Sequence, residues 1–486
     1  MWKGVRFTVA TLAMAALVGG VALAAFPAPA QATPGLDPAQ LRGSIGYLRQ
    51  TYGVSEQEAL RRLALQQTAQ DLAGRLAQRT PATYAGMWLD QAAGGRLVVA
   101  TTSPAAVDGE LRGVPDRVHI TVRRVAHSLA ELQATQRRLA ARLGDGPASV
   151  LLPEVVVQEN RVVVFKRDWL QTSGVRVAAV PAGSTVDSAV AAEGDRAVLR
   201  ALPEPQPLAT PNVDVGYCHP LFCPAKYGPI RGGLRLDISR DDGSVGGCTS
   251  GFTVRAHGGT FDGSAFVLTA GHCVASARHQ HIDAPEHNGA ELLTEDPGLA
   301  SNAFPFDYAI LPYTNKSVAR ARFERFSRHN LVLSFCRTGP NDAQPGTTCV
   351  DGNIPIRSVT RFADVLAGSI VCASGAAASS VDYPAAYDSG PGVGYRPGTR
   401  CGRVTSTDVA INTDICARAG DSGSPLFSEV DHAGYGILEG SRQHRTGPCQ
   451  PGEDNNYIPL STIFDQVNSS PSAGGSTFAV ITSARG

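Results

Sequence analysis

All ten cysteines of this 486-residue chain lie at or after Cys218, and none precedes it. An even number of cysteines in an exported chain predicts disulfides, so the C-terminal part is expected to be cross-linked. A transient segment does not need cross-links, so this division predicts two parts with different fates. The length also exceeds one ordinary domain, and two or three are expected.

The N-terminus has the pattern of a secretory signal. Lys3 and Arg6 precede an apolar run over about 7–26, and Ala30-Gln31-Ala32 matches an A-x-A cleavage site. We therefore predict a signal peptide at 1–32 and a secreted, extracellular product, with a retained membrane anchor as the alternative. No other stretch is long and apolar enough to span a bilayer, so no membrane partner is expected after signal removal.

Charge gives no indication of a polyanionic partner. The chain has 43 Lys and Arg against 43 Asp and Glu, without a basic block. Neither nucleic acid nor an anionic membrane surface is therefore an expected partner.

The cysteine-free region at 33–200 is predicted to be mixed α/β, and nothing in it has a catalytic pattern. The expected elements are a helix headed by the capping-box spacing of Ser55 and Glu58, strands at 84–90 and 96–101, an amphipathic helix of about six turns through Val122, Val125, Leu129, Leu132, Leu139 and Leu143, and a hairpin of 155–157 and 162–164.

A proline-rich stretch at 201–212 predicts an extended linker, which we place within a linker and processing region at 201–229. Beyond it, short β-type runs alternate with Gly, Asn, Asp and Ser clusters, which predicts an all-β barrel or sandwich. One helix is expected at 460–467. The Ser- and Gly-rich end at 469–486 is predicted to be a flexible tail.

Three short strings combine the groups of one kind of chemistry. Thr269-Ala270-Gly271-His272-Cys273 ends an apolar run, Phe306-Asp307-Tyr308-Ala309-Ile310-Leu311 begins a strand-like segment, and Gly420-Asp421-Ser422-Gly423-Ser424-Pro425 is a glycine-rich turn. Alone, each also fits an ordinary turn or a structural histidine. Together, His, Asp and Ser in that order are the parts of a nucleophilic hydrolase.

The chemistry assigns a role to each group. A serine hydroxyl is a poor nucleophile near neutral pH, so Ser422 needs a base, and His272 is the candidate because an imidazole generally titrates near that pH. Asp307 is then expected to fix the tautomer of His272 and stabilise the imidazolium. Gly420 is expected to permit an unusual backbone angle, so that backbone N–H groups point at the developing oxyanion.

On these strings, the C-terminal region resembles a chymotrypsin-fold serine protease of the bacterial streptogrisin and α-lytic protease branch. The spacing from Cys416 to Ser422, Ile230-Arg231-Gly232-Gly233 and the strand-like run from Cys248 to Val254 are also similar to that branch. The likeness covers roughly 230–468. The strings from Tyr84 to Asp90, from Leu97 to Ala100 and from Asn160 to Val164 look like the pro-region of such proteases.

The resemblance implies an all-β fold of two six-stranded antiparallel barrels, preceded by an α/β pro-region that assists folding and inhibits the mature enzyme. It implies a serine endopeptidase with an acyl-enzyme on Ser422, oxyanion donation by the N–H groups of Gly420 and Ser422, and no cofactor. Polypeptide substrates and its own pro-region are the implied partners of a monomer. Pro-region removal is expected between about 201 and 230. An independent interaction domain at 33–200 is the alternative.

Disulfide pairings follow only by analogy with the family. The analogy implies Cys248 with Cys273, Cys372 with Cys401 and Cys416 with Cys449, and it leaves Cys336 with Cys349 and Cys218 with Cys223 as extra bridges.

Substrate specificity is where the sequence departs from the family. Glu439, Gly440 and Ser441 stand where the family usually has Ser-Gly-Gly, on the strand that pairs with the substrate backbone. A glutamate near Asp307 would repel it unless one carboxyl is protonated or turned away. Asp414 is a candidate for the base of the pocket, favouring Arg or Lys, with a solvated turn aspartate as the alternative. An apparent insertion at 379–397 could reshape the cleft rim.

Two other readings stay open. His279, His281 and His287, with Asp283 and Glu286, are metal-ligand types, but they match no closed zinc spacing, so we expect a polar loop and no metal. The departures at Glu439 and Ser441 also leave a catalytically silent binding protein on the same fold, and a serine esterase is a third possibility.

Overall fold

The computed structural model describes residues 36–144, 149–171, 186–210, 212, 231–239, 243–275, 282–283, 291–293, 296–312, 330–334, 352–376, 398–443 and 449–482. The chain divides into two compact units, Met1–Pro34 and Gly35–Gly486, and the description that follows concerns the second. The predicted signal peptide, the segment 379–397 and the pairs Cys218–Cys223 and Cys336–Cys349 lie outside the described residues.

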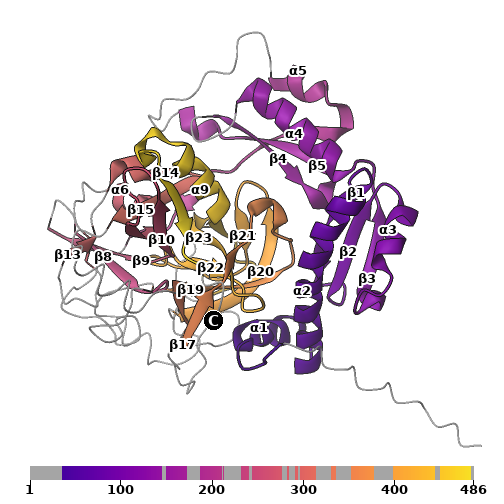
Figure 1. Ribbon diagram of the computed structural model, residues 1–486, viewed down its shortest axis with the longest axis horizontal. Helices are drawn as coiled ribbons and strands as arrows, with labels where there is room; N and C mark the ends of the chain where they lie inside the picture. The colour runs from indigo at the N-terminus through magenta and orange to yellow at the C-terminus, as the bar shows by residue number, and fades with distance from the viewer. Residues whose placement is uncertain are drawn as a thin grey trace, which may run out of the picture. The chain divides into compact units, whose positions relative to one another are not determined.

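The first part of the second unit is mixed α/β, as expected for a pro-region (indigo to magenta in Figure 1). Its elements are α1 (Arg42–Tyr52), α2 (Glu56–Arg79), β1 (Tyr84–Asp90), β2 (Arg96–Thr101), α3 (Pro104–Leu111), β3 (Ile120–Arg124), α4 (Leu129–Leu143), β4 (Leu151–Val156), β5 (Arg161–Lys166), α5 (Val186–Ala191), β6 (Ala197–Ala201) and β7 (Gln206–Pro207), with 3₁₀ turns at Arg117–His119, Val157–Glu159, Asp168–Gln171 and Gly194–Arg196.

Two three-stranded sheets repeat one topology here. In β1-β2-β3 and in β4-β5-β6, the first two strands form an antiparallel hairpin and the third adds in parallel to the second. The Ser55 side chain accepts a hydrogen bond from the N–H of Glu58 and caps α2, as the spacing predicts. Among the described residues, no helix has both the length and the apolar character that crossing a membrane requires.

The six-turn helix predicted from Val122 to Leu143 is wrong in its first part. Residues Ile120–Arg124 form β3 beside β2, and α4 begins only at Leu129. A capping box sets that start, because Ser128 and Glu131 each accept a hydrogen bond from the other's backbone N–H. The apolar residues of β3 have helical spacing only by chance. Their strand conformation is fixed by pairing with β2, which lies more than fifteen residues earlier in the sequence.

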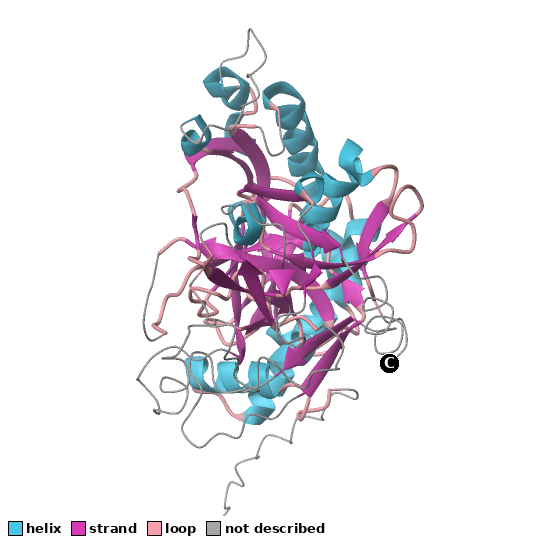
Figure 2. Ribbon diagram, turned by 90° about the vertical axis from the view of Figure 1, so that its left-hand side faces the viewer, coloured by secondary structure: helices cyan, strands magenta, loops and turns pink. Residues whose placement is uncertain are grey.

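The second part is rich in strands (Figure 2). Its elements are β8 (Arg235–Ser239), β9 (Val245–Thr249), β10 (Thr253–His257), β11 (Ala265–Thr269), α6 (His272–Ala275), β12 (Ile282–Asp283), β13 (Glu291–Leu293), β14 (Ala300–Ala303), β15 (Phe306–Pro312), β16 (Asn330–Ser334), β17 (Gly352–Ile356), β18 (Ser358–Val359), β19 (Ile370–Gly375), β20 (Gly398–Thr407), β21 (Ile411–Thr413), β22 (Pro425–Phe427), β23 (Ala433–Ser441), β24 (Asn455–Pro459), α9 (Leu460–Ser469) and β25 (Thr477–Val480), with 3₁₀ turns at Pro297–Leu299, Phe362–Asp364 and Pro471–Ala473.

The strands fit the expected chymotrypsin-like two-barrel fold. Strands β19 to β24 follow the order β23-β22-β19-β20-β21-β24, and β24 pairs back onto β23, which closes a six-stranded antiparallel barrel. The other half is an open half-barrel of two antiparallel sheets, β14-β15-β11-β10-β25 and β13-β12-β8-β9. Within the described ranges, therefore, only the barrel that carries the serine string is closed.

The end of the chain differs from the flexible tail predicted at 469–486. Residues Thr477–Val480 form β25, which pairs with β10, and Phe478 is buried against the rings of Phe261 and Phe266. The predicted helix at 460–467 is present as α9. Composition suggested mobility, but Phe478 and Val480 alternate inward and complete a sheet of the half-barrel.

Buried side-chain contacts join the N-terminal part to the closed barrel. The Gln66 amide donates to the carbonyl of Ile370 at 3.1 Å and accepts from the Ile370 N–H at 2.7 Å. The N–H of Leu89 donates to the carbonyl of Ala367 at 2.8 Å. Hydrogen bonds of this kind give partners to buried polar atoms that would otherwise have none.

Candidate active site

The ends of two neighbouring strands bring His272 and Asp307 together. His272 opens α6 directly after β11, and Asp307 is the second residue of β15, which pairs with β11. Gly271 makes the approach possible, because a Cβ there would run into the carbonyl oxygen of Ser301 and lie 2.8 Å from Oδ1 of Asp307. The glycine before the histidine is thus a steric requirement of the site.

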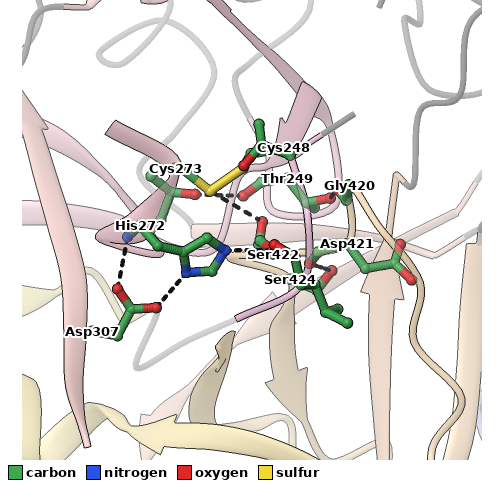
Figure 3. Close-up of a disulfide and its surroundings, with 12 residues drawn as sticks. Cys248, Thr249, His272, Cys273, Asp307, Gly420, Asp421, Ser422 and Ser424 are labelled. Atoms are coloured by element: carbon green, nitrogen blue, oxygen red, sulfur yellow. Dashed lines mark hydrogen bonds and ion pairs between the residues drawn. A yellow bond between two sulfur atoms is a disulfide. The ribbon is translucent and has the colours of Figure 1, made fainter. Parts of the chain in front are cut away.

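His272 lies between Asp307 and Ser422 (Figure 3). Its Nδ1 is 2.6 Å from Oδ2 of Asp307, and its Nε2 is 2.7 Å from Oγ of Ser422. The backbone N–H of His272 donates to the second Asp307 oxygen at 2.7 Å. The three residues are 7%, 1% and 0% exposed, respectively, so little water competes for these bonds.

This geometry suits proton transfer. A carboxylate at Nδ1 favours the tautomer with its proton there, which leaves the Nε2 lone pair facing the serine hydroxyl. The Ser422 proton can then pass to Nε2 as Oγ attacks, and the buried Asp307 charge would stabilise the resulting imidazolium.

The turn that carries Ser422 has the backbone conformation expected of a glycine-rich string. Gly420 has φ +94° and Gly423 has φ +87°, a region in which residues with a Cβ are strained. Thr249 at the end of β9 holds this turn, since its N–H donates to the carbonyl of Ser422 and its hydroxyl donates to the carbonyl of Gly420, both at 2.8 Å.

A buried carboxylate needs a cationic partner, and for Asp421 that partner is Arg400 of β20. Nη2 of Arg400 lies 3.0 Å from Oδ2 of Asp421, and both side chains are almost completely buried. The Arg418 N–H also donates to that carboxylate at 3.0 Å. The pair fixes the residue next to Ser422, a role that no local motif around Arg400 indicated.

The three disulfides that the family resemblance implies fall within the described residues, and each is formed. Sγ–Sγ distances are 2.03 Å for Cys248–Cys273, 1.95 Å for Cys372–Cys401 and 2.00 Å for Cys416–Cys449. The first tethers the residue after His272 to β9, beside the serine turn (Figure 3).

Glu439 is buried near Asp307. Its side chain is 1% exposed, and burial, followed by the negative charge of Asp307, raises its pKa well above 4.5. Within the described part of the chain, Oε2 of Glu439 has no hydrogen-bond partner. Burial and the repulsion foreseen from the sequence thus both favour the protonated form of Glu439.

Gly440 and Ser441 form an edge on which another segment of the chain lies. In antiparallel register, Gly440 pairs with Pro207 and Ser441 pairs with Gln206, so β7 adds to β23. Beyond β7, the Gly420 N–H donates to the carbonyl of Ala209 at 3.2 Å. The proline-rich composition of 201–212 predicted only a linker, because prolines give no strand signal, so this pairing was not foreseen.

Asp414 lies where the closed barrel contacts the N-terminal part. Its carboxylate accepts a hydrogen bond from the Tyr47 hydroxyl at 2.7 Å and from the Arg403 N–H at 2.6 Å. Both oxygens thus have partners in the precursor. One partner, Tyr47, belongs to the part expected to be removed, so a role of Asp414 at the base of the pocket stays a prediction.

The three histidines and Glu286 of the histidine-rich loop lie outside the described residues, and only Asp283 falls inside, in β12. Elsewhere in the described ranges, one group of metal-ligand types gathers at Cys372, Cys401 and Glu429. Its two sulfurs are joined in a disulfide and offer no thiolate.

Comparison with known proteins adds a family match in the N-terminal part. Residues 57–109, which run from α2 into α3, match the family model described as "Alpha-lytic protease pro N-terminal". A solved structure of HL collagenase is similar at 13% identity over 50% of this chain and 96% of that chain, with a TM-score of 0.29, which is too low to show a shared fold. The pro-region match, with the two-barrel arrangement of the strands, supports an alpha-lytic protease-type precursor.

Proposed function

We propose that this chain is the precursor of a secreted serine endopeptidase that acts through His272, Asp307 and Ser422. The observation that carries the proposal is the position of the His272 ring, 2.6 Å from a buried carboxylate on one nitrogen and 2.7 Å from the serine hydroxyl on the other. A general base poised between an orienting acid and a nucleophile is the arrangement that acyl transfer requires.

In the proposed reaction, Oγ of Ser422 attacks the carbonyl carbon of a peptide while His272 takes the serine proton. The N–H groups of Gly420 and Ser422 hold the oxyanion of the tetrahedral intermediate. His272 then protonates the leaving amine as the C–N bond breaks, and water hydrolyses the ester on Ser422. Asp307 orients His272 and stabilises the imidazolium throughout.

We assign the signal to 1–32, the pro-region to 33–200, the linker and processing region to 201–229 and the protease to 230–468 together with β25, which pairs with β10 of the half-barrel. A topology of mainly non-local strand pairing folds slowly, so a template that docks on the barrel has a physical purpose. The hydrogen bonds of Gln66 with Ile370 are the kind of contact through which it would act. Export and a monomeric mature enzyme complete the proposal.

Hydrolysis assays separate the proposal from its alternatives. Matured wild-type protein should hydrolyse casein, and the Ser422→Ala variant should lose at least about 10³-fold of that activity because the nucleophile is gone. Equal casein turnover by both proteins would refute Ser422 as nucleophile. Ester turnover without peptide turnover would support an esterase, and neither turnover in a correctly folded protein would support a silent binding protein.

A further inference from the structure

We propose that the Leu208–Ala209 peptide bond is the first bond this enzyme cuts, and that the enzyme selects leucine-like side chains at the residue that supplies the scissile carbonyl. The inference rests on the proposed serine endopeptidase function and adds to it a processing site and a substrate class.

The segment is held as an added strand, as extended peptides often are at an exposed sheet edge. Pro207 and Gln206 pair with Gly440 and Ser441, and the N–H of Leu208 donates to the carbonyl of Glu439 at 3.4 Å. Gly440 lets the backbones approach, because a Cβ there would run into the Gln206 carbonyl and lie 3.1 Å from Cα of Pro207.

The register brings Leu208 to the nucleophile. The carbonyl oxygen of Leu208 lies 3.5 Å from Oγ of Ser422, and the next carbonyl, that of Ala209, accepts from the Gly420 N–H. The carbonyl of the Leu208–Ala209 bond itself thus lies at the serine, and the following carbonyl, that of Ala209, lies at an oxyanion donor. A shift that moves the Leu208 carbonyl onto the Gly420 N–H gives the geometry of attack.

Beyond the serine, the segment continues along the other half of the fold. Oγ1 of Thr210 lies 3.9 Å from Sγ of Cys248, and Asn212 forms an antiparallel bridge with Gly246 of β9. The chain therefore passes from β23 of the closed barrel, across Ser422, to the half-barrel. A path that touches both halves and the nucleophile is that of a bound substrate.

The side chain of Leu208 indicates the preferred residue. It is 6% exposed and belongs to the apolar cluster of the closed barrel that includes Ile415, Ala417 and Leu438. The described residues of this cluster are apolar, and apolar surroundings favour an aliphatic side chain over a charged one.

The step balances with water as the co-reactant. A bond forms between Oγ of Ser422 and the carbonyl carbon of Leu208, the C–N bond to Ala209 breaks, and His272 passes the serine proton to the amine of Ala209. Water then hydrolyses the ester, which leaves a carboxylate on Leu208 and restores Ser422. Because the segment belongs to the same chain, the first cut is intramolecular.

Refolding of the full-length precursor, followed by mass spectrometry, tests the processing site. We expect a new N-terminus at Ala209, with a rate constant that does not change over a hundredfold range of protein concentration, and no cut in Ser422→Ala. The Ala209→Pro variant should slow this cut at least a hundredfold, since proline constrains the leaving amide, whereas the matched Ala209→Ser variant should be cut at the wild-type rate.

Tripeptide p-nitroanilides test the substrate class on the matured enzyme, independently of how well any variant folds. Acetyl-Gln-Pro-Leu should be hydrolysed with a kcat/KM at least a hundredfold above that of acetyl-Gln-Pro-Arg or acetyl-Gln-Pro-Asp. A preference for the arginine or aspartate peptide would overturn the substrate class.

The possible failures are distinguishable. A first cut at another bond by an enzyme that hydrolyses the peptides would overturn the processing site and leave the serine endopeptidase standing. No cut and no peptide hydrolysis in a folded protein would overturn both proposals.

Discussion

At the scale of single residues, local sequence predicted the groups of the site better than their surroundings. Gly420 was expected to need an unusual backbone angle, and it has φ +94°. Arg400, which pairs with Asp421, could not be foreseen, because its position depends on the pairing of β19 with β20. A motif records neighbours in sequence, whereas a buried charge takes whichever partner the fold supplies.

Glu439 should make the free energy of unfolding depend on pH. Burial and the charge of Asp307 raise its pKa in the folded chain, whereas the unfolded carboxyl ionises near pH 4.5. Above that pH the folded state holds the extra proton, so stability falls as pH rises, by up to about 1.4 kcal/mol per pH unit.

The Glu439→Gln variant tests this effect in a Ser422→Ala background, which prevents self-digestion. Because the amide does not titrate, the variant should gain stability relative to its parent as pH rises above about 4.5 in denaturant unfolding. A stability difference that stays constant across this range would contradict a raised pKa of Glu439.

At the scale of elements, sequence patterns located segments whose signals are local. Strands β1 and β2 and helix α9 lie where alternation and periodicity predicted them. Segments that depend on a distant partner were misread: β3 was assigned to a helix and β25 to a flexible tail. Strand β3 forms by pairing with β2, and β25 forms by pairing with β10. The composition of a short stretch of sequence does not reveal such pairing.

Phe478 tests whether β25 is part of the half-barrel. It is 1% exposed and lies against Phe266, with ring centroids 5.1 Å apart. We expect Phe478→Ala to lower the free energy of unfolding by about 3–5 kcal/mol through loss of burial and a cavity. Thr477→Ala, on the exposed face of the same strand, is the control and should change it by about 0.5 kcal/mol or less. Similar small effects for both would favour a mobile tail.

At the scale of the whole molecule, the N-terminal part and the barrels share buried polar contacts that neither could satisfy alone. Gln66 supplies one donor and one acceptor to the backbone of Ile370, much as a neighbouring strand would. Sequence indicated a pro-region through the absence of cysteine, but it could not indicate which surface it covers. The covered surface depends on side chains such as Gln66, and in the sequence Gln66 looks like any other polar residue of a helix.

A separate pro-region added to matured enzyme should reveal the importance of this contact. The Gln66→Leu variant leaves the N–H and carbonyl of Ile370 buried without partners, so it should inhibit at least about tenfold more weakly, as a loss of 1–3 kcal/mol implies. Gln67→Leu is the matched control, because Gln67 is exposed on the same helix, and it should inhibit as the parent does. Equal inhibition by both variants would mean that the Gln66 contact does not hold the pro-region on the enzyme.

The most direct test of a His–Asp–Ser nucleophile is labelling with a serine-reactive fluorophosphonate and identification of the modified peptide by mass spectrometry. One adduct is predicted, on Ser422 of the matured protein, because His272 activates that hydroxyl. It should be absent from Ser422→Ala and weak in the uncut precursor, whose cleft holds Leu208. A folded, matured protein without an adduct on Ser422, or with labelling that persists in Ser422→Ala, would contradict the account.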